Sequence, residues 1–400
     1  APEKPVDYSS HKLIKIFPKN VKQLVDLRRF GSDFKMDYWN APMPDMRPVL
    51  TLVPGEKIGA EFLVALNKSR IGFEVTADNF QKMLNAERDE NSRNLRRFRS
   101  FFDYQSTYHS YDEIIAELQR VSTNNSKVVY NSMGKSYEGR QIPFLTITNT
   151  DVKEPKKTIV FECGIHAREW VRVSTATCLW MANTLITDSI NEELLKKFEF
   201  IVIPSLNPDG YVYSHTVNRM WRKTRSPQRG GQRGADPNRN FDSHFGQAGT
   251  QLDPSGEAYP GVKPFSEVET KALANLVLSK RGQIAAYFAI HSFSQLWMYP
   301  YGYTSVPPPN YAQLERLSTR AVDAIRATSG LVFNKGTIAR TIYKASGSSI
   351  DWAYDSAGCK VVFALELRDK GQYGFILPPS QIRSAATETW AGIKAVLGEL

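Results

Sequence analysis

The chain has 400 residues, of which 42% are apolar and 23% charged, and its formal net charge is +10. These proportions are typical of an ordinary globular protein, and no apolar run approaches the roughly 20 residues that a membrane-spanning helix needs. The basic residues are scattered instead of forming one stripe, which argues against nucleic acid as a partner, and the length predicts two domains.

The chain begins Ala1-Pro2-Glu3-Lys4-Pro5, with neither an initiator Met nor an apolar signal core. We expect such a beginning in a secreted protein whose signal has been removed, or in a trimmed sequence. Three cysteines cannot all pair within one chain, and Cys163 and Cys178 lie in apolar segments, so we predict buried thiols. Asn67 and Asn124 each begin an Asn-X-Ser triplet, a weak glycosylation signal.

The first part of the chain predicts a small α+β domain over residues 1–76. Its apolar residues alternate in some segments and recur at helical spacing in others. The expected order is strand 11–17, helix 21–30, strands 34–39 and 49–53, helix 56–66 and strand 71–76. This βαββαβ order is typical of a ferredoxin-like domain, and we see no catalytic group of residues in it.

Residues 77–101 predict a charged helix that ends in a cluster of arginines, namely Arg93, Arg96, Arg97 and Arg99. A run of charges is usually the solvated face of a helix. The competing interpretation is a connecting segment with several Arg-X bonds open to a trypsin-like protease. Its position between two domain-like blocks favours the connecting segment.

Residues 102–400 predict an α/β domain in which strands and helices alternate. The expected strands are 127–132, 142–148, 158–163, 198–204, 284–290 and 361–365, and the expected helices are 111–121, one from near Val171 to about Ile186, 263–281, 311–328 and 380–397. This alternation indicates a mixed, mostly parallel twisted sheet flanked by helices. Asn207-Pro208-Asp209-Gly210 is a strong turn signal.

His166 and Glu169 lie in the loop after strand 158–163, where α/β proteins often place chemistry. Imidazole nitrogen and carboxylate oxygen both suit zinc, but a lone HxxE is more often an unremarkable His beside a surface carboxylate. His291 ends strand 284–290, and such a residue is usually structural. Together the three residues make a His₂Glu set, a known composition for catalytic zinc that leaves one position for water.

Glu366 follows a strongly apolar strand, where a carboxylate resists ionisation unless it is paired. One interpretation is a buried ion pair with Arg368 or another cation. The other is a general base with a raised pKa, which takes a proton from water and passes it to a leaving amine.

Six motifs in order carry a resemblance to a known family. They begin at Gly164, Asn218, Asp236, His291, Tyr343 and Phe363, and read GIHAREW, NRMWRK, DPNRNF, HSF, YKASG and FALELRD. From about Phe102 to the C-terminus the chain resembles the pancreatic-type zinc carboxypeptidases, and its first hundred residues resemble their activation segment. The resemblance implies a carboxypeptidase-like catalytic domain over 102–400, a ferredoxin-like activation domain, and a monomeric digestive proenzyme that is secreted into the gut lumen.

The resemblance also implies a role for each matching residue. His166, Glu169 and His291 would bind one zinc ion, and Asp236 would fix the tautomer of His166. Glu366 would be the catalytic base and Arg222 the stabiliser of the oxyanion. The peptide substrate would contact Asn238, Arg239, Tyr343, Arg168, Arg219, Ser292 and Ile350. Outside the family context the arginines would be surface charges, and Tyr343 and Ile350 ordinary packing residues.

Specificity is predicted from Ile350, which corresponds to the base of the side-chain pocket. An Asp there would pair with a C-terminal Lys or Arg, whereas an Ile leaves a cation unpaired. The other matching positions, Met298, Gly302, Ile338, Ile342 and Ala364, are apolar or small. We therefore expect type A specificity, for aromatic or large aliphatic C-terminal residues.

Two departures from the family pattern stand out. Phe293 replaces a Tyr that is common after the His-Ser pair, which predicts a changed affinity without loss of the reaction. The disulfide of many relatives has no partners between Arg225 and Asp253. Two other functions stay open: a carboxypeptidase for basic residues, disfavoured by Ile350, and a non-catalytic binding module, which would typically lack one of the metal ligands or the base.

Overall fold

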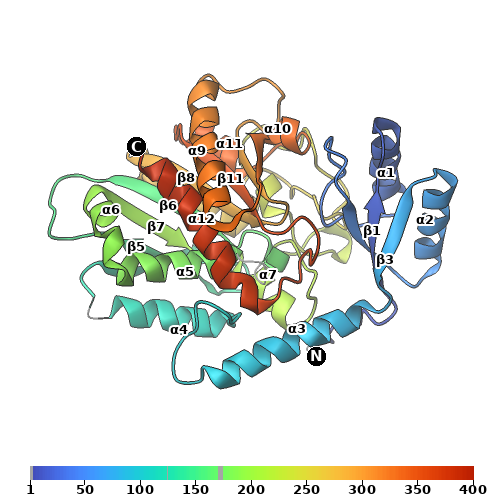
Figure 1. The fold of residues 1–400 in the computed structure, drawn as a ribbon, viewed down its shortest axis with the longest axis horizontal. Coiled ribbons are helices and arrows are strands. Elements are labelled where there is room, and N and C mark those ends of the chain that lie inside the picture. Colours follow the sequence, from blue (N-terminus) through green and yellow to red (C-terminus); the bar gives the residue numbers. More distant parts are fainter. Residues whose placement is uncertain (1–2, 124, 170–173) are drawn as a thin grey trace.

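Two β-sheets organise the chain, which a computed structural model describes over residues 3–123, 125–169 and 174–400. A three-stranded sheet, in the order β2-β1-β3, belongs to the N-terminal part, and an eight-stranded sheet, in the order β10-β9-β11-β8-β6-β7-β5-β4, forms the larger body (Figure 1). Asn124 and the predicted beginning of a helix near Val171 lie outside the described residues. No helix within those residues is long and apolar enough to cross a membrane.

The N-terminal sheet has two buried faces. Ile14 and Ile16 of its central strand pack on Leu27 and Phe62 from the two helices, whereas Leu13 belongs to a second apolar cluster that includes Phe375 of the larger body. Alternate residues of a strand point to opposite faces, so one strand serves both contacts. The elements are β1 (Lys12–Phe17), α1 (Val21–Asp33), β2 (Val49–Val53), α2 (Lys57–Lys68) and β3 (Gly72–Ala77).

The strand predicted over 34–39 is wrong. Helix α1 extends to Asp33, and the N–H of Phe34 bonds to the carbonyl of Phe30 as the helix ends. Lys35 then has a φ of 52°, a left-handed conformation that breaks an extended chain. Only Tyr38 forms an isolated bridge, to Thr51 of β2. The small α+β domain is confirmed with one strand fewer than expected.

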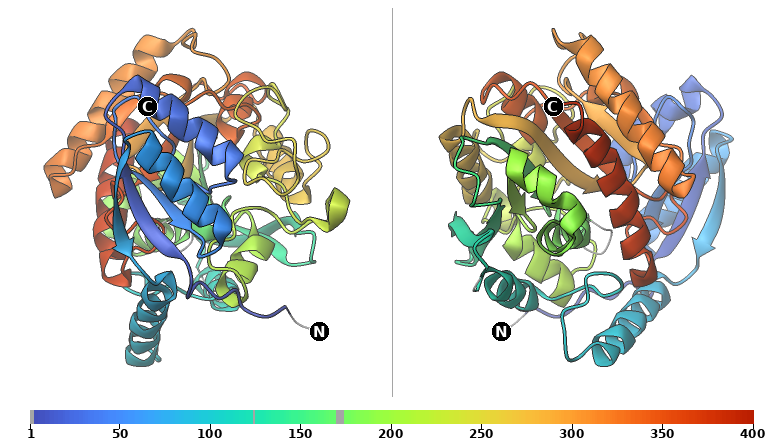
Figure 2. Two further views of the ribbon diagram at one scale, coloured as in Figure 1. Left: turned by 90° about the vertical axis from the view of Figure 1, so that its right-hand side faces the viewer. Right: turned by 60° about the vertical axis from the view of Figure 1, so that its left-hand side comes forward.

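The predicted charged helix is α3 (Phe80–Arg97), which joins the small domain to the body. The side chain of Asn79 accepts a hydrogen bond from the N–H of Lys82 and so caps the helix. Near its other end, Asn91 and Asn94 bond to the backbone of residues 106–108. Helix α3 therefore lies along the body instead of projecting into solvent (Figures 1 and 2).

The strands β7, β6, β8 and β11 at the centre of the large sheet are parallel. Antiparallel pairs join them to β9 on one flank and to β5 and β4 on the other, and the edge strand β10 is parallel to β9. The central strands are almost wholly buried, as apolar runs covered on both faces require. The strands are β4 (Val128–Lys135), β5 (Gln141–Ile147), β6 (Lys157–Cys163), β7 (Phe198–Ile203), β8 (Ile284–Ser292), β9 (Leu296–Tyr299), β10 (Asn334–Thr337) and β11 (Val362–Leu367).

Helices α5, α9 and α12 pack together along one face of this sheet, whereas α11 packs against β11 and β8 (Figure 2, right). The fold class predicted from the alternating pattern is confirmed. The helices of the body are α4 (Tyr111–Ser122), α5 (Ser174–Thr187), α6 (Glu192–Lys197), α7 (Pro208–Thr216), α8 (Val268–Ser279), α9 (Tyr311–Ser329), α10 (Ile338–Thr341), α11 (Ser349–Asp355) and α12 (Ile382–Leu397).

The turn predicted at Asn207-Pro208-Asp209-Gly210 is instead the beginning of helix α7. The side chain of Asn207 accepts a hydrogen bond from the N–H of Gly210, and Pro208 occupies the first helical position. Asn caps and first-turn prolines are favourable at helix beginnings, which explains why the same residue types indicated a turn.

The prediction of buried thiols at Cys163 and Cys178 is also wrong, because the two residues form a disulfide. Both side chains are fully buried, as predicted, but the end of β6 and the first turns of α5 bring them together. Cys359 is the free cysteine and is buried. Sequence spacing could not reveal this pairing, because it depends on how α5 folds back over the sheet.

Candidate active site

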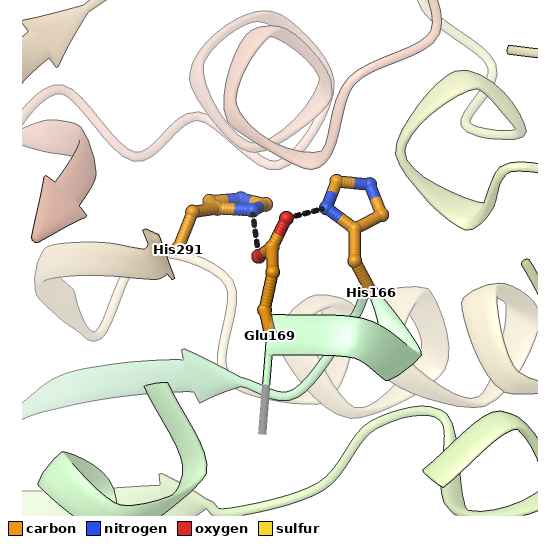
Figure 3. A group of neighbouring side chains, drawn as sticks. All are labelled: His166, Glu169 and His291. Atoms are coloured by element: carbon orange, nitrogen blue, oxygen red, sulfur yellow. Dashed lines mark hydrogen bonds and ion pairs between the residues drawn. The ribbon is translucent and has the colours of Figure 1, made fainter. Parts of the chain in front are cut away.

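Three side chains from two strand ends meet at the carboxyl edge of the large sheet. His166 follows β6, Glu169 ends the 3₁₀ turn η1 (Ala167–Glu169), and His291 lies near the end of β8. The N–H of Ala167 bonds to the carbonyl of Arg222, which holds the turn in place. All three side chains point into one space (Figure 3).

The geometry of the three residues fits a metal ion. Their candidate ligand atoms lie within 4.8 Å of one another, and all three residues are buried. Nδ1 of His166 lies 2.7 Å from Oε1 of Glu169, and Nδ1 of His291 lies 3.2 Å from Oε2 of Glu169. Two imidazoles and one carboxylate form a donor set that suits catalytic zinc.

The carboxylate of Asp236 contacts both His166 and Arg222. Its Oδ1 lies 3.1 Å from Nε2 of His166 and its Oδ2 lies 2.9 Å from Nη2 of Arg222. A carboxylate at Nε2 favours the tautomer that leaves Nδ1 free to act as a ligand. Asp236 thus ties His166 to Arg222, whose guanidinium also lies 3.8 Å from the Glu169 carboxylate.

Opposite charges control the ionisation of this cluster. Burial opposes ionisation of Asp236, but Arg222 and His166 hold the pKa of its carboxyl well below the usual value. Burial likewise opposes ionisation of Glu169, and the two histidines lower its pKa. The pKa of His291 is raised to about 9, because Glu169 outweighs the burial that would lower it.

Glu366 lies in β11, directly beside His291 of β8 in the register of the sheet. Arg368 pairs with Glu388 at 2.5 and 2.9 Å, so the alternative of an ion pair between Glu366 and Arg368 is wrong. The pKa of Glu366 is raised to about 8 by burial and then by the Glu169 carboxylate, against the lowering effect of His291 and Arg222. The half-buried Glu366 side chain lines the same cavity as the three candidate ligands.

A second polar group faces this cavity from the 3₁₀ turn η4 (Pro237–Arg239). Arg239 donates to the hydroxyl of Tyr343 at 3.0 Å and to the carbonyl of Gly249. The Oδ1 of Asn238 accepts from the N–H of Ser349, which directs its amide group. Ser292 is buried, and its hydroxyl has no hydrogen-bond partner among the described residues.

The cavity has a volume of about 700 Å³ and an apolar end. Ile350 lines that end and is 1% exposed. Of the other predicted pocket residues, Met298, Ile338, Ile342 and Ala364 line the cavity, whereas Gly302 does not. The neighbouring Asp351 is turned away, with its carboxylate accepting from the N–H groups of Gly302 and Tyr303.

The small N-terminal domain roofs this cavity. Asp37 makes a two-pronged ion pair with Arg168, whose guanidinium also lies 4.4 Å from the Phe375 ring centroid. Arg219 does not line this cavity; it lines a neighbouring one, where Glu87 of α3 pairs with it at 2.9 and 3.2 Å. Two of the predicted substrate contacts are therefore occupied by carboxylates from the N-terminal part of the chain.

Sequence reasoning missed several residues of this site. No local sequence pattern marks Asp37, Glu87 or Glu257 as part of a functional site, because acidic residues are common on protein surfaces. Glu257 lines the cavity, and burial with the nearby Asp37 raises its pKa to about 7. Phe375 contacts both Phe293 and Trp39 at 5.3 Å between ring centroids, so Phe293 belongs to the interface between the domains.

The arginine cluster lies at the far end of α3. Arg93, Arg96 and Arg97 are exposed on its last turns, and Arg99 is exposed just beyond the helix. Helix α3 thus carries both Glu87, near its middle, and the arginine cluster at its C-terminal end.

The fold and the site together define a metal-dependent hydrolase. The zinc carboxypeptidase family matches residues 114–392, and the carboxypeptidase activation peptide matches residues 14–87. The chain therefore belongs to the zinc carboxypeptidase family and is the zymogen of a metallocarboxypeptidase.

The similar proteins include members with different names. The chain is 38% identical to carboxypeptidase A2 of Rattus norvegicus, over 96% of this chain and 92% of that protein. It is 41% identical to carboxypeptidase B of Astacus astacus, over 73% of this chain and 96% of that protein. The crystal structure of carboxypeptidase A from Helicoverpa armigera has a TM-score of 0.90 at 28% identity, covering 98% of this chain and 97% of that one.

Proposed function

We propose that the activated protein removes aromatic or large aliphatic residues from the C-termini of peptides. The observation that carries this proposal is the apolar end of the cavity around Ile350. A Lys or Arg side chain would lose its hydration there without gaining a carboxylate partner, whereas an aromatic side chain would gain from burial.

The C-terminal carboxylate of the substrate would be held by Arg239 and Asn238. A guanidinium and an amide provide directional donors that match a carboxylate. Tyr343, now 3.0 Å from Arg239, would move aside to admit the substrate and then cover the bound residue. Arg168 and Arg219, released from Asp37 and Glu87, would contact residues further along the peptide, and Ser292 would contact the backbone.

Zinc held by His166, Glu169 and His291 would supply a Lewis acid and favour ionisation of water at the site. Glu366 would accept a proton from the attacking water and deliver it to the leaving amine, a role that a raised pKa favours. Arg222, held by Asp236, would stabilise the negative oxygen of the tetrahedral intermediate without having to reorganise.

The activation segment would keep the enzyme latent because it covers the cavity and neutralises Arg168 and Arg219. A trypsin-like protease would release it by cutting among Arg93, Arg96, Arg97 and Arg99. We place the domains at 1–76, 77–101 and 102–400. The disulfide between Cys163 and Cys178 supports secretion, because such bonds persist in oxidising compartments, and digestion in a gut lumen by a monomer remains our interpretation.

The specificity is tested by comparing kcat/KM of the trypsin-treated protein on matched peptides that end in Phe and in Arg. We expect the Phe peptide to be preferred by at least about a hundredfold. A preference for Arg would overturn the assignment of the pocket and favour specificity for basic residues, the alternative left open by the sequence.

A further inference from the structure

One buried carboxylate close to the metal-binding residues has no role in the site described above. Glu162 of β6 is fully buried and lies in register with Ile203 of β7 and Ala289 of β8. Paired residues of parallel strands point to the same face of a sheet, and His291 follows Ala289 by two positions. Glu162 therefore lies on the face of the sheet that carries His291, two residues further from the carboxyl edge.

Two hydroxyl groups lead from this carboxylate to helix α11. The hydroxyl of the buried Tyr287 donates to Oε2 of Glu162 at 2.5 Å, whereas Oε1 has no hydrogen-bond partner among the described residues. Burial and the Glu162 carboxylate raise the pKa of Tyr287 well above its usual value, while the neighbouring hydroxyl of Ser349 lowers it. That serine hydroxyl is also buried, and within the described part of the chain it meets no partner in hydrogen-bonding geometry. We call Glu162, Tyr287 and Ser349 the buried polar chain.

The buried polar chain ends at residues that bound the substrate pocket. Ser349 is the first residue of α11, and its N–H donates to Oδ1 of Asn238 at 3.1 Å. The next residue, Ile350, lines the apolar end of the cavity, and α11 packs against β8 and β11. Neither Glu162 nor Tyr287 nor Ser349 lines the cavity itself. The buried polar chain can therefore act on a substrate only through Asn238 and Ile350.

Stability alone does not explain an acidic residue at this place. Burying a carboxylate oxygen and a hydroxyl without partners costs free energy, and an apolar side chain of similar volume would avoid that cost. Directional hydrogen bonds, in contrast, restrict a side chain to one orientation more strictly than apolar packing does. A polar chain between the strands that carry the metal-binding residues and helix α11 is therefore suited to fix where α11 begins.

We infer that Glu162 is a positioning residue for the substrate pocket, which acts through Tyr287 and Ser349. By fixing the beginning of α11, it holds Asn238 and Ile350 where they can bind the C-terminal residue of a peptide. Because this inference rests on the proposed roles of Asn238 and Ile350, it concerns the binding of substrate and not the chemical step at the metal.

The test compares four proteins after activation by trypsin: the wild type, Tyr287→Phe, Glu162→Gln and the control Tyr111→Phe. Tyr287→Phe interrupts the buried polar chain by removing one hydroxyl. Glu162→Gln removes the negative charge but keeps the chain, because its amide carbonyl still accepts from Tyr287 and its amide N–H groups can donate toward Ser349. Tyr111→Phe removes a comparable hydrogen bond, to the carbonyl of Gln141, from a tyrosine that does not line the cavity.

We expect KM on a peptide ending in Phe to rise about tenfold in Tyr287→Phe, while kcat stays within about twofold of the wild-type value, because only substrate binding is weakened. Competitive inhibition by free phenylalanine should weaken by a similar factor. Glu162→Gln and the control should both match the wild type, and the zinc content should be the same in all four proteins. An unchanged KM in Tyr287→Phe would overturn the inference. So would a loss of kcat or of zinc in Glu162→Gln, because Glu162 would then act on the metal ligands through its charge.

Ser349→Ala is a milder variant, which removes a single oxygen at the other end of the buried polar chain and decides the question if Tyr287→Phe does not fold. We expect it to raise KM about threefold, and the double variant Tyr287→Phe/Ser349→Ala to bind no worse than Tyr287→Phe, because both changes interrupt one connection. Additive effects of the two changes would contradict a shared connection. If the activated wild type preferred a peptide ending in Arg, the proposed specificity would fail, and the same KM comparison on that peptide would still decide the role of Glu162.

Discussion

Ile350 is the single residue on which the proposed specificity most depends. Ile350→Asp would place a carboxylate at the apolar end of the cavity, where it can pair with a C-terminal Arg or Lys. We expect kcat/KM on a peptide ending in Phe to fall by about a hundredfold and that on a peptide ending in Arg to rise. Ile350→Val, which keeps the site apolar, should retain the preference for Phe. An unchanged ratio in the Asp variant would contradict the pocket assignment.

Glu366 is the residue on which the chemistry depends. Glu366→Gln keeps nearly the same shape but cannot accept a proton, so kcat should fall by about a thousandfold or more while the zinc content is unchanged. In the wild type kcat/KM should rise with pH as Glu366 loses its proton, with an apparent pKa between the ordinary value of 4.5 and the raised value of about 8, because the charge of bound zinc lowers it. A Gln variant with wild-type kcat would contradict the assignment.

Glu269 offers a test of stability far from the chemistry. This buried residue accepts from the N–H of Tyr137, and burial together with Glu267 and Asp209 raises its pKa to about 7. The folded protein therefore holds the Glu269 proton more tightly than the unfolded chain, so this group costs stability as pH rises from about 4.5 to 7. Glu269→Gln should gain thermal stability relative to the wild type across that window. A difference that does not change with pH would contradict the raised pKa.

At the scale of elements, we expect helix α3 to determine which Arg-X bond trypsin cuts first. Proteases bind extended backbone, whereas Arg93, Arg96 and Arg97 lie inside the helix that Asn94 helps to hold against Ser106. Arg99 lies beyond the helix end and is exposed. We expect limited trypsin to produce Ser100 as the first new N-terminus, identified by mass spectrometry over a time course.

Matched substitutions separate this order from simple accessibility. Arg99→Gln should slow the first cut severalfold, whereas Arg93→Gln, which alters another exposed residue but one within the helix, should leave it unchanged. An initial N-terminus at Asn94 or Phe98 would show instead that the helix unwinds readily for the protease.

The long elements could be predicted from the sequence because their periodicity extends over several turns or a full strand. Helix α9 and strand β7 were expected close to their observed bounds. Strands β9 and β10 were missed, because four residues such as Asn334–Thr337 have no strand pattern of their own and are strands only through pairing with a neighbour. The disulfide at Cys163 likewise depends on a contact between two elements.

At the scale of the whole molecule, the site depends on sheet topology more than on local sequence. His166 and Glu169 were recognisable as a pair in the sequence. Their role as metal ligands could be inferred only together with His291 and Glu366, which β8 and β11 bring side by side. The sequence motifs indicated these residues through a family resemblance, and spacing alone did not. The contacts of Asp37 and Glu87 with the body could not be predicted, because surface carboxylates find partners only after the domains have packed.

The central claim is that this chain is a latent zinc carboxypeptidase whose activation segment covers a site for apolar C-terminal residues. The most direct test measures release of the free C-terminal amino acid from a peptide ending in Phe, before and after limited trypsin, with and without a zinc chelator. We predict no appreciable release by the intact chain, rapid release of Phe after cleavage, and loss of that activity in the chelator. Equal release before and after cleavage, or release that persists in the chelator, would contradict the account.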